Sequence, residues 1–106
     1  QLACARVKEN WEDAFLSSVG SQPLDRLVDR IRTATKVGLF TSDTVTPQVI
    51  AQRMLDAGID YFTIYVCENI GSPNERVTRG TVAEISKQKF SPLNVTLLIR
   101  KPGAPD

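Results

Sequence analysis

The sequence contains no histidine and only two cysteines among its 106 residues. Histidine is the commonest general base near neutral pH and the commonest zinc ligand, so its absence argues against both roles. Cys4 and Cys67 stand far apart in the sequence, and we expect both to be reduced, free thiols, as in a cytoplasmic protein. A metal site made by this chain alone is therefore not expected.

The sequence also lacks long apolar runs and a strong net charge. No stretch approaches the ~18 consecutive apolar residues of a membrane helix, and no signal peptide is visible. Lysine and arginine total 13 and aspartate and glutamate 12, which gives a net charge of +1. We therefore expect no membrane partner and no nucleic-acid partner, and a cytoplasmic location.

The length indicates one domain. We expect this domain over residues 15–101, preceded by the tail of another domain or a linker over 1–14 and followed by a loose tail over 102–106. Since the chain begins at Gln1, in a helix-compatible stretch, we expect it to be a piece of a longer protein.

Two stretches have the spacing of amphipathic helices. Apolar residues recur on one helical face over 24–31 and again over 50–57. Before the second stretch, Thr46 is a natural N-cap and Pro47 suits the first helical position. A short third helix is expected over 81–88.

Between these helices lie stretches rich in β-branched and aromatic residues. The stretch 61–67 is apolar on both faces, which is typical of a central strand covered on both sides. Further strands are expected over 15–19, 37–40, 76–78 and 95–99. The alternation predicts an α/β fold, with a mixed sheet of about five strands and helices on its faces.

The loop after the central strand is the best candidate for a ligand site. The stretch 71–74 (Gly-Ser-Pro-Asn) predicts a turn, and polar loops at the ends of buried strands often carry ligand contacts. Glu68 and Glu75 flank this turn, and a buried Glu68 could act as a base. No nucleophile accompanies them, however, and Glu75 with Arg76 is equally a surface pair. The residues alone leave open whether this is a connection or half of a binding site.

Several runs around this loop resemble one family. They are 68–77 (Glu-Asn-Ile-Gly-Ser-Pro-Asn-Glu-Arg-Val), 79–85 (Arg-Gly-Thr-Val-Ala-Glu-Ile), 90–95 (Phe-Ser-Pro-Leu-Asn-Val), 36–43 (Lys-Val-Gly-Leu-Phe-Thr-Ser-Asp) and 46–51 (Thr-Pro-Gln-Val-Ile-Ala). Together they resemble the second half of the precorrin methyltransferases, in the tetrapyrrole methylase family. The pattern Glu-Asn-x-Gly-x-x-x-Glu-Arg is the most specific part. After Ser18-Val19 the family often continues His-Gly-Arg, whereas this chain has Gly-Ser-Gln at 20–22.

The resemblance implies two α/β domains that hold S-adenosylmethionine in the cleft between them, with this chain as the second domain. It implies a precorrin tetrapyrrole as substrate and a homodimer, and it assigns no catalytic residue and no metal. Arg76 and Arg79 could meet the carboxylates of a tetrapyrrole. The strand ends that would cover the adenosine are Thr41, Glu68, Asn69, Ile70, Leu93 and Asn94.

The absence of histidine is compatible with this chemistry, because methyl transfer from a sulfonium needs alignment and desolvation more than acid–base groups. The alternative is a non-catalytic α/β ligand-binding or dimerisation module, since the sequence holds no complete catalytic constellation. A relative that methylates RNA or a modified histidine is a further possibility.

Overall fold

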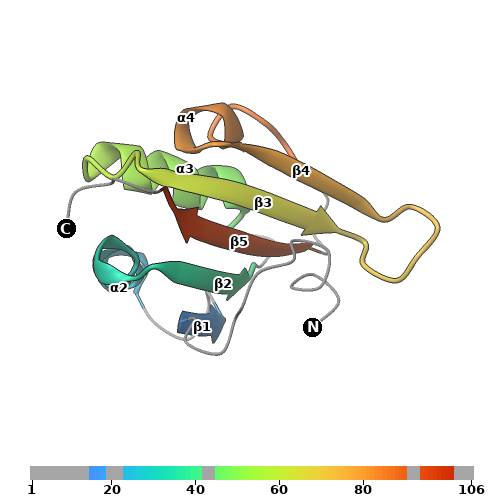
Figure 1. Ribbon diagram of the computed structural model, residues 1–106, viewed down its shortest axis with the longest axis horizontal. Coiled ribbons are helices and arrows are strands. Elements are labelled where there is room, and N and C mark those ends of the chain that lie inside the picture. The colour runs from blue at the N-terminus through green and yellow to red at the C-terminus, as the bar shows by residue number, and fades with distance from the viewer. Residues whose placement is uncertain (1–14, 19–22, 42–44, 91–93, 102–106) are drawn as a thin grey trace.

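The computed structural model describes residues 15–18, 23–41, 45–90 and 94–101, and Figure 1 shows their arrangement. The segments expected over 1–14 and 102–106 lie outside these ranges. The longest helices described have ten residues, too few to cross a membrane. The elements are β1 (Phe15–Ser18), α2 (Leu24–Thr33), β2 (Lys36–Phe40), α3 (Pro47–Asp56), β3 (Phe62–Glu68), β4 (Arg76–Thr81), α4 (Val82–Ile85) and β5 (Asn94–Arg100).

These strands form one five-stranded sheet in the order β1-β2-β5-β3-β4. β1 pairs with β2 in parallel, whereas β5 runs antiparallel to both of its neighbours and β4 runs antiparallel to β3. The prediction of a mixed α/β sheet of about five strands is therefore confirmed. Because β5 lies antiparallel between β2 and β3, its first residues adjoin the last residues of both neighbours (Figure 1).

The helices α2, α3 and α4 pack on one face of the sheet. Alternate residues of β3 (Phe62, Ile64 and Val66) point to this face, as strand geometry requires, and join Leu98 of β5 in the main core. All four side chains are buried. The helices thus seal one side of the sheet with the apolar stripes that the sequence predicted.

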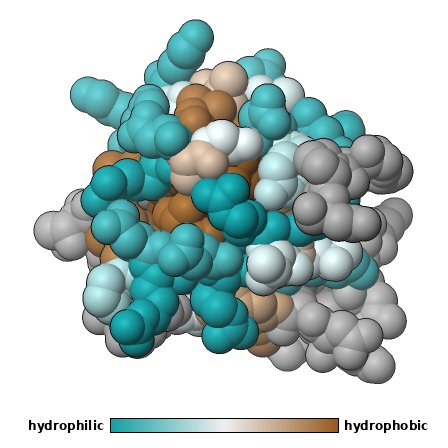
Figure 2. All heavy atoms as spheres, turned by 90° about the vertical axis from the view of Figure 1, so that its left-hand side faces the viewer, coloured by the Kyte–Doolittle hydropathy of each residue, from teal (hydrophilic) through white to brown (hydrophobic). Residues whose placement is uncertain are grey.

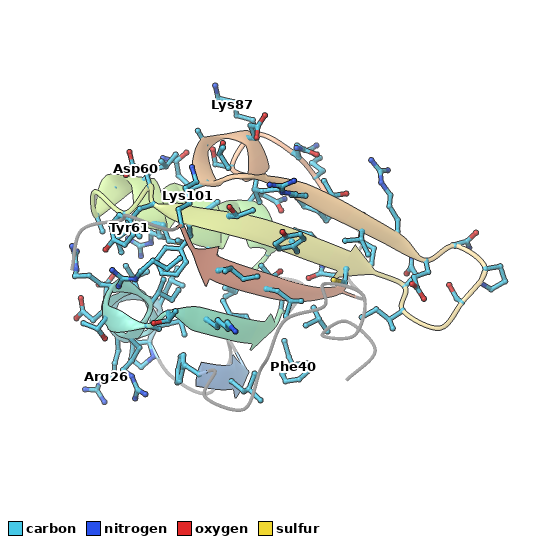
Figure 3. The ribbon with its side chains drawn as sticks, in the orientation of Figure 1. Arg26, Phe40, Asp60, Tyr61, Lys87 and Lys101 are labelled. Carbon is cyan, nitrogen blue, oxygen red and sulfur yellow. The ribbon has the colours of Figure 1, made fainter. Side chains whose placement is uncertain are left out.

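On the other face, the expected cover of the central strand is present in part, since Cys67 is buried while Thr63 and Tyr65 are half-buried. There, Cys67 and Leu97 are buried in a small cluster, but no described helix covers them. Leu16 is 56% exposed and Phe40, near the end of β2 in Figure 3, is 54% exposed. The sequence could not reveal this, because an apolar residue under a helix and one on an open face have the same letter pattern.

Two helix starts use their threonines differently. Thr46 occupies the predicted N-cap of α3, but its side chain makes no capping hydrogen bond. At α4, the Glu84 backbone N–H donates to Thr81 Oγ1 at 3.1 Å, and the Thr81 N–H donates to Glu84 Oε1 at 2.8 Å. This reciprocal capping box fixes where β4 ends and α4 begins. The helix expected over 81–88 is shorter, Val82–Ile85, with Thr81 as its N-cap.

Arg100 joins the end of β5 to the end of α2, at the end of the sheet that lies far from the β3–β4 loop. Its Nε donates to the Ala34 carbonyl at 3.1 Å and an Nη to the Arg32 carbonyl at 2.6 Å, which satisfies carbonyls at the end of α2. The guanidinium lies 5.0 Å from the centre of the Tyr61 ring, a cation–π distance. Figure 2 shows this end of the molecule, where hydrophilic residues predominate, and Figure 3 labels Tyr61.

Thr78 gives a test of the packing around β4. Its Oγ1 is buried and has no hydrogen-bond partner among the described residues, so Thr78→Val should raise the free energy of unfolding by about 1 kcal/mol in urea titrations. Thr81→Val is the control, because it removes a bonded hydroxyl and should lower stability by about 1 kcal/mol. A loss of stability in Thr78→Val would show that its hydroxyl is satisfied after all.

Candidate functional site

Strand ends converge at one end of the sheet, to the right in Figure 1. Glu68, the last residue of β3, lies opposite Asn94, the first residue of β5. Phe40, the last residue of β2, lies opposite Val95. The fold therefore brings together segments near residues 41, 68 and 94 that are separated by more than twenty positions in the sequence.

A pocket of about 350 Å³ opens at this end. Ile70 and Val95 give it an apolar wall, and both also pack against the small cluster on the open face of the sheet. Asn69, Ser72 and Asn94 add two amides and a hydroxyl to its lining. Apolar walls with a few polar groups are typical of small-molecule sites.

The loop that forms one wall of the pocket is held by its own hydrogen bonds. The Ser72 N–H donates to the Asn69 carbonyl, and the Glu75 N–H donates to the Ser72 carbonyl, both at 3.1 Å. Asn69 and Gly71 have positive φ values of 51° and 86°, which suit asparagine and glycine better than other residues. The predicted turn is therefore present, and its backbone bonds give the pocket wall a defined shape.

The two carboxylates around the turn have different surroundings. Glu75 Oε1 accepts the Gly71 N–H at 3.0 Å, so this carboxylate closes the loop. Glu68 is 8% exposed and shares the helix-covered face with Val66. Neither glutamate lines the pocket, and the geometry gives no support to Glu68 as a base acting there.

The structure places the predicted cofactor residues at different distances from the pocket. Asn69, Ile70 and Asn94 line it directly. Thr41 does not line it, but its hydroxyl donates to Asn94 Oδ1. Leu93 lies outside the described residues. Three of the six predicted residues thus line one pocket, and their role as cofactor contacts stays a prediction.

Sequence reasoning missed two lining residues. Ser72 was read only as part of the turn, and Val95 only as the start of a strand. Val95 neighbours Asn94, and its place beside the loop depends on the pairing of β5 with β3. Only that pairing brings Val95 close to Ile70, and no local sequence pattern predicts this contact.

The two arginines proposed to meet substrate carboxylates point to opposite faces of the sheet. Arg76 is paired with Glu68, on the helix-covered side, whereas Arg79 is paired with Tyr65, on the open side. Both are exposed. An odd spacing along a strand places side chains on opposite faces, so these two residues do not form a clamp on one side.

Potential metal ligands do not gather in the described part of the chain: no three of its Cys, Asp or Glu residues lie close enough to hold an ion. Cys67 is buried and unbridged, as predicted, and Cys4 lies outside the described residues. The site therefore offers amides, one hydroxyl and apolar surface, which suit the binding of a neutral, partly apolar ligand.

Comparison with known proteins adds to this geometry. No protein-family model matches the sequence. A decarboxylating precorrin-6Y C(5,15)-methyltransferase from a Sinorhizobium species is 32% identical over 94 residues, which cover 89% of this chain and 23% of that protein. The predicted resemblance to the tetrapyrrole methylases is confirmed. The chain spans about a quarter of the length of this relative.

Solved structures show the same fold at low sequence identity. The methyltransferase CobJ has a TM-score of 0.65 at 13% identity, over 93% of this chain and 46% of that one. Diphthine synthase has a TM-score of 0.63 at 17% identity, over 94% and 44%. A uroporphyrin-III C-methyltransferase from Thermus thermophilus, solved with S-adenosylhomocysteine, has a TM-score of 0.60 at 18% identity, over 82% and 40%. The methylase fold assignment therefore extends over most of the chain.

Gly71 tests whether the loop conformation shapes the pocket. Gly71→Ala forces a side chain into a left-handed backbone and should lower the free energy of unfolding by about 1 kcal/mol in urea titrations. Gly58→Ala is the matched control, because Gly58 also has a positive φ, of 77°, and does not line the pocket. Both variants should lose similar stability, but only Gly71→Ala should shift the NMR signals of Ile70 and Val95. Equal spectra around the pocket in both variants would contradict this role of the loop.

Proposed function

We propose that this chain is the C-terminal, cofactor-capping domain of an S-adenosylmethionine-dependent precorrin-6Y C(5,15)-methyltransferase of cobalamin biosynthesis. Residues 15–101 are the domain in this proposal, and a partner domain supplies the rest of the cleft. The observation that supports it most is the pocket in which the Glu-Asn-x-Gly loop meets the first residues of β5. Those two segments carry the sequence resemblance to the methylases.

The lining of the pocket fits the nucleoside half of the cofactor. Adenine needs a flat apolar wall and a few hydrogen-bonding groups, and Ile70 with Val95 provides the wall. Asn69 and Asn94 provide the amides. When bound, S-adenosylmethionine supplies the methyl group on its sulfonium, so the domain itself has to bind, orient and exclude water.

The size of the pocket bears on the substrate. About 350 Å³ is at the lower end of the ~300–1,000 Å³ found for small-molecule pockets, which suits a nucleoside better than a tetrapyrrole. In this proposal, the precorrin therefore binds mainly to the partner domain. Since Arg76 and Arg79 point to opposite faces, at most one of them faces a given substrate carboxylate from this domain.

A second candidate function is a ligand-binding or dimerisation module without catalysis. The open face of the sheet favours it, because Leu16, Phe40 and Val77 are large apolar side chains at least 40% exposed there. The fold alone does not choose between the functions, since diphthine synthase shares it. A homodimer is compatible with both, and light scattering of the purified chain measures it.

Titration of the chain with S-adenosylhomocysteine tests the proposed site. Chemical-shift changes in NMR spectra should be largest at Ile70, Asn94 and Val95, which line the pocket. Ile70→Glu should weaken binding at least tenfold, because it places a charge in the apolar wall. Val49→Glu is the control, since Val49 is an exposed apolar residue on α3. Binding that is equally weakened by both variants, or shifts centred elsewhere, would contradict the site.

The reaction is tested in a protein that joins this chain to its partner domain. With S-adenosylmethionine carrying a labelled methyl group and precorrin-6Y, we expect labelled product, and Asn94→Ala should raise the KM for the cofactor more than it lowers kcat. If no label is transferred, the proposed methyltransferase activity is refuted, and the non-catalytic binding module is the better interpretation.

A further inference from the structure

Two side chains at the middle of the open face of the sheet are buried, although no described helix lies over them. Cys67 of β3 is 0% exposed and Leu97 of β5 is 1% exposed. The residues packed around this pair, Tyr65, Ile70 and Val95, belong to the same strands and the adjoining loop. Neighbours within a sheet shield the sides of a strand residue, whereas its tip points out of the sheet and is buried by a layer above it. The burial of this pair therefore indicates a cover that the described residues do not supply.

The exposed apolar side chains of the same face lie toward its two edges. Leu16 of β1 is 56% exposed and Phe40 of β2 is 54% exposed, while Val77 of β4, at the other edge, is 40% exposed. Burial in the middle with exposure on both sides outlines a cover narrower than the sheet. One helix has this width, because a helix is about 10 Å across and five strands at a spacing of ~4.8 Å span about 19 Å.

The segment 1–14, which precedes β1 and lies outside the described residues, has the sequence pattern of such a helix. Its apolar residues recur at spacings of three and four and fall on one helical face: Ala3, Cys4, Val7, Trp11 and Ala14. Its acidic residues fall on the opposite side: Glu9, Glu12 and Asp13. A helix of fourteen residues measures about 21 Å, which is enough to run back along the sheet from Phe15, the first residue of β1.

The charges fit the same arrangement. Lys36 and Arg79 point to the open face, and among the described strand residues no carboxylate points there. Lys36 lies close to the start of β1, since Phe15 pairs with the residue that follows this lysine. Glu12 and Asp13 immediately precede β1, so a segment that turns back over the face brings acidic side chains toward a cationic edge.

A second copy of the chain fits this face less well. A two-fold dimer brings the same patch of both copies together, so the cations Lys36 and Arg79 of one copy approach those of the other. Like charges that meet across an interface are unfavourable. The charges therefore favour the chain's own acidic segment as the occupant.

We propose that residues 1–14 form a helix that packs on the open face of the sheet, with its apolar stripe over Cys67 and Leu97. Together with the helices on the other face, this segment gives the sheet a third layer. The folding unit then begins before residue 15, so residues 1–14 belong to this domain rather than to the tail of a preceding one. Because Ile70 and Val95 both contact the buried pair and line the pocket, the helix lies next to the apolar wall of the pocket.

The single tryptophan of the chain, Trp11, tests the position of the segment. In the full chain, we expect nuclear Overhauser contacts from its ring to Leu16, Tyr65 or Leu97, which lie in one row across the open face. Acrylamide should quench the fluorescence of Trp11 much less in the native protein than in urea. Equal quenching in the two states, or the absence of these contacts, would overturn the proposal.

The protection of Cys67 tests the cover from the side of the sheet. In a Cys4→Ser background, a thiol reagent should label Cys67 slowly, because its side chain is buried. Val7→Glu places a charge in the apolar stripe and should raise the labelling rate about tenfold or more. Ala5→Glu is the matched control, because position 5 lies on the opposite side of the helix, and its rate should stay within about twofold of the background.

The outcomes separate this cover from other occupants. Equal labelling rates in the two glutamate variants overturn the proposal, and so does a background rate that rises on dilution, as it would if a second copy were the cover. The NMR signals of α2 and α3 show whether the core of Val7→Glu stays folded, and Val7→Ala gives the same comparison if it does not. None of these measurements uses S-adenosylhomocysteine, so a negative result leaves the proposed function standing.

Discussion

The antiparallel insertion of β5 between β2 and β3 is the constraint on which the rest of the structure depends. Its backbone pairs with Lys36 to Phe40 on one side and with residues along the whole of β3 on the other, so it joins the two halves of the sheet. Because it runs against both neighbours, its first residue comes to the end where both of them finish. A parallel β5 would place Asn94 at the opposite end of the sheet, and no pocket would form beside Asn69.

The chemistry of the pocket follows from which groups the strand ends bring together. Ile70 and Val95 contribute apolar surface, and the amides contribute directional hydrogen bonds. Among the described residues, no carboxylate lines the pocket, since Glu68 faces the helices and Glu75 closes the loop. Such a lining can bind and orient a ligand through apolar contact and hydrogen bonds.

The two faces of the sheet differ in how far their apolar side chains are buried. The helices bury one face in a continuous core, and the capping box at Thr81 and Glu84 fixes the last of them against β4. The other face keeps Leu16 and Phe40 exposed and continues into the pocket through Val95, which lies opposite Phe40. A ligand in the pocket therefore lies next to an apolar surface that another polypeptide can cover.

The sequence by itself determined the fold class, the helical faces and the turn after β3, because these depend on local periodicity and on the special backbone of residues such as Gly71. Through the loop motif it also indicated three residues that line the pocket, Asn69, Ile70 and Asn94. Only the tertiary structure decided that Val95 lines the pocket, that Arg76 and Arg79 diverge, and that Thr41 and Thr96 meet on Asn94. The physical reason is register: pairing between distant strands sets which side chains face one another, and a shift by one residue would turn every one of them to the other face.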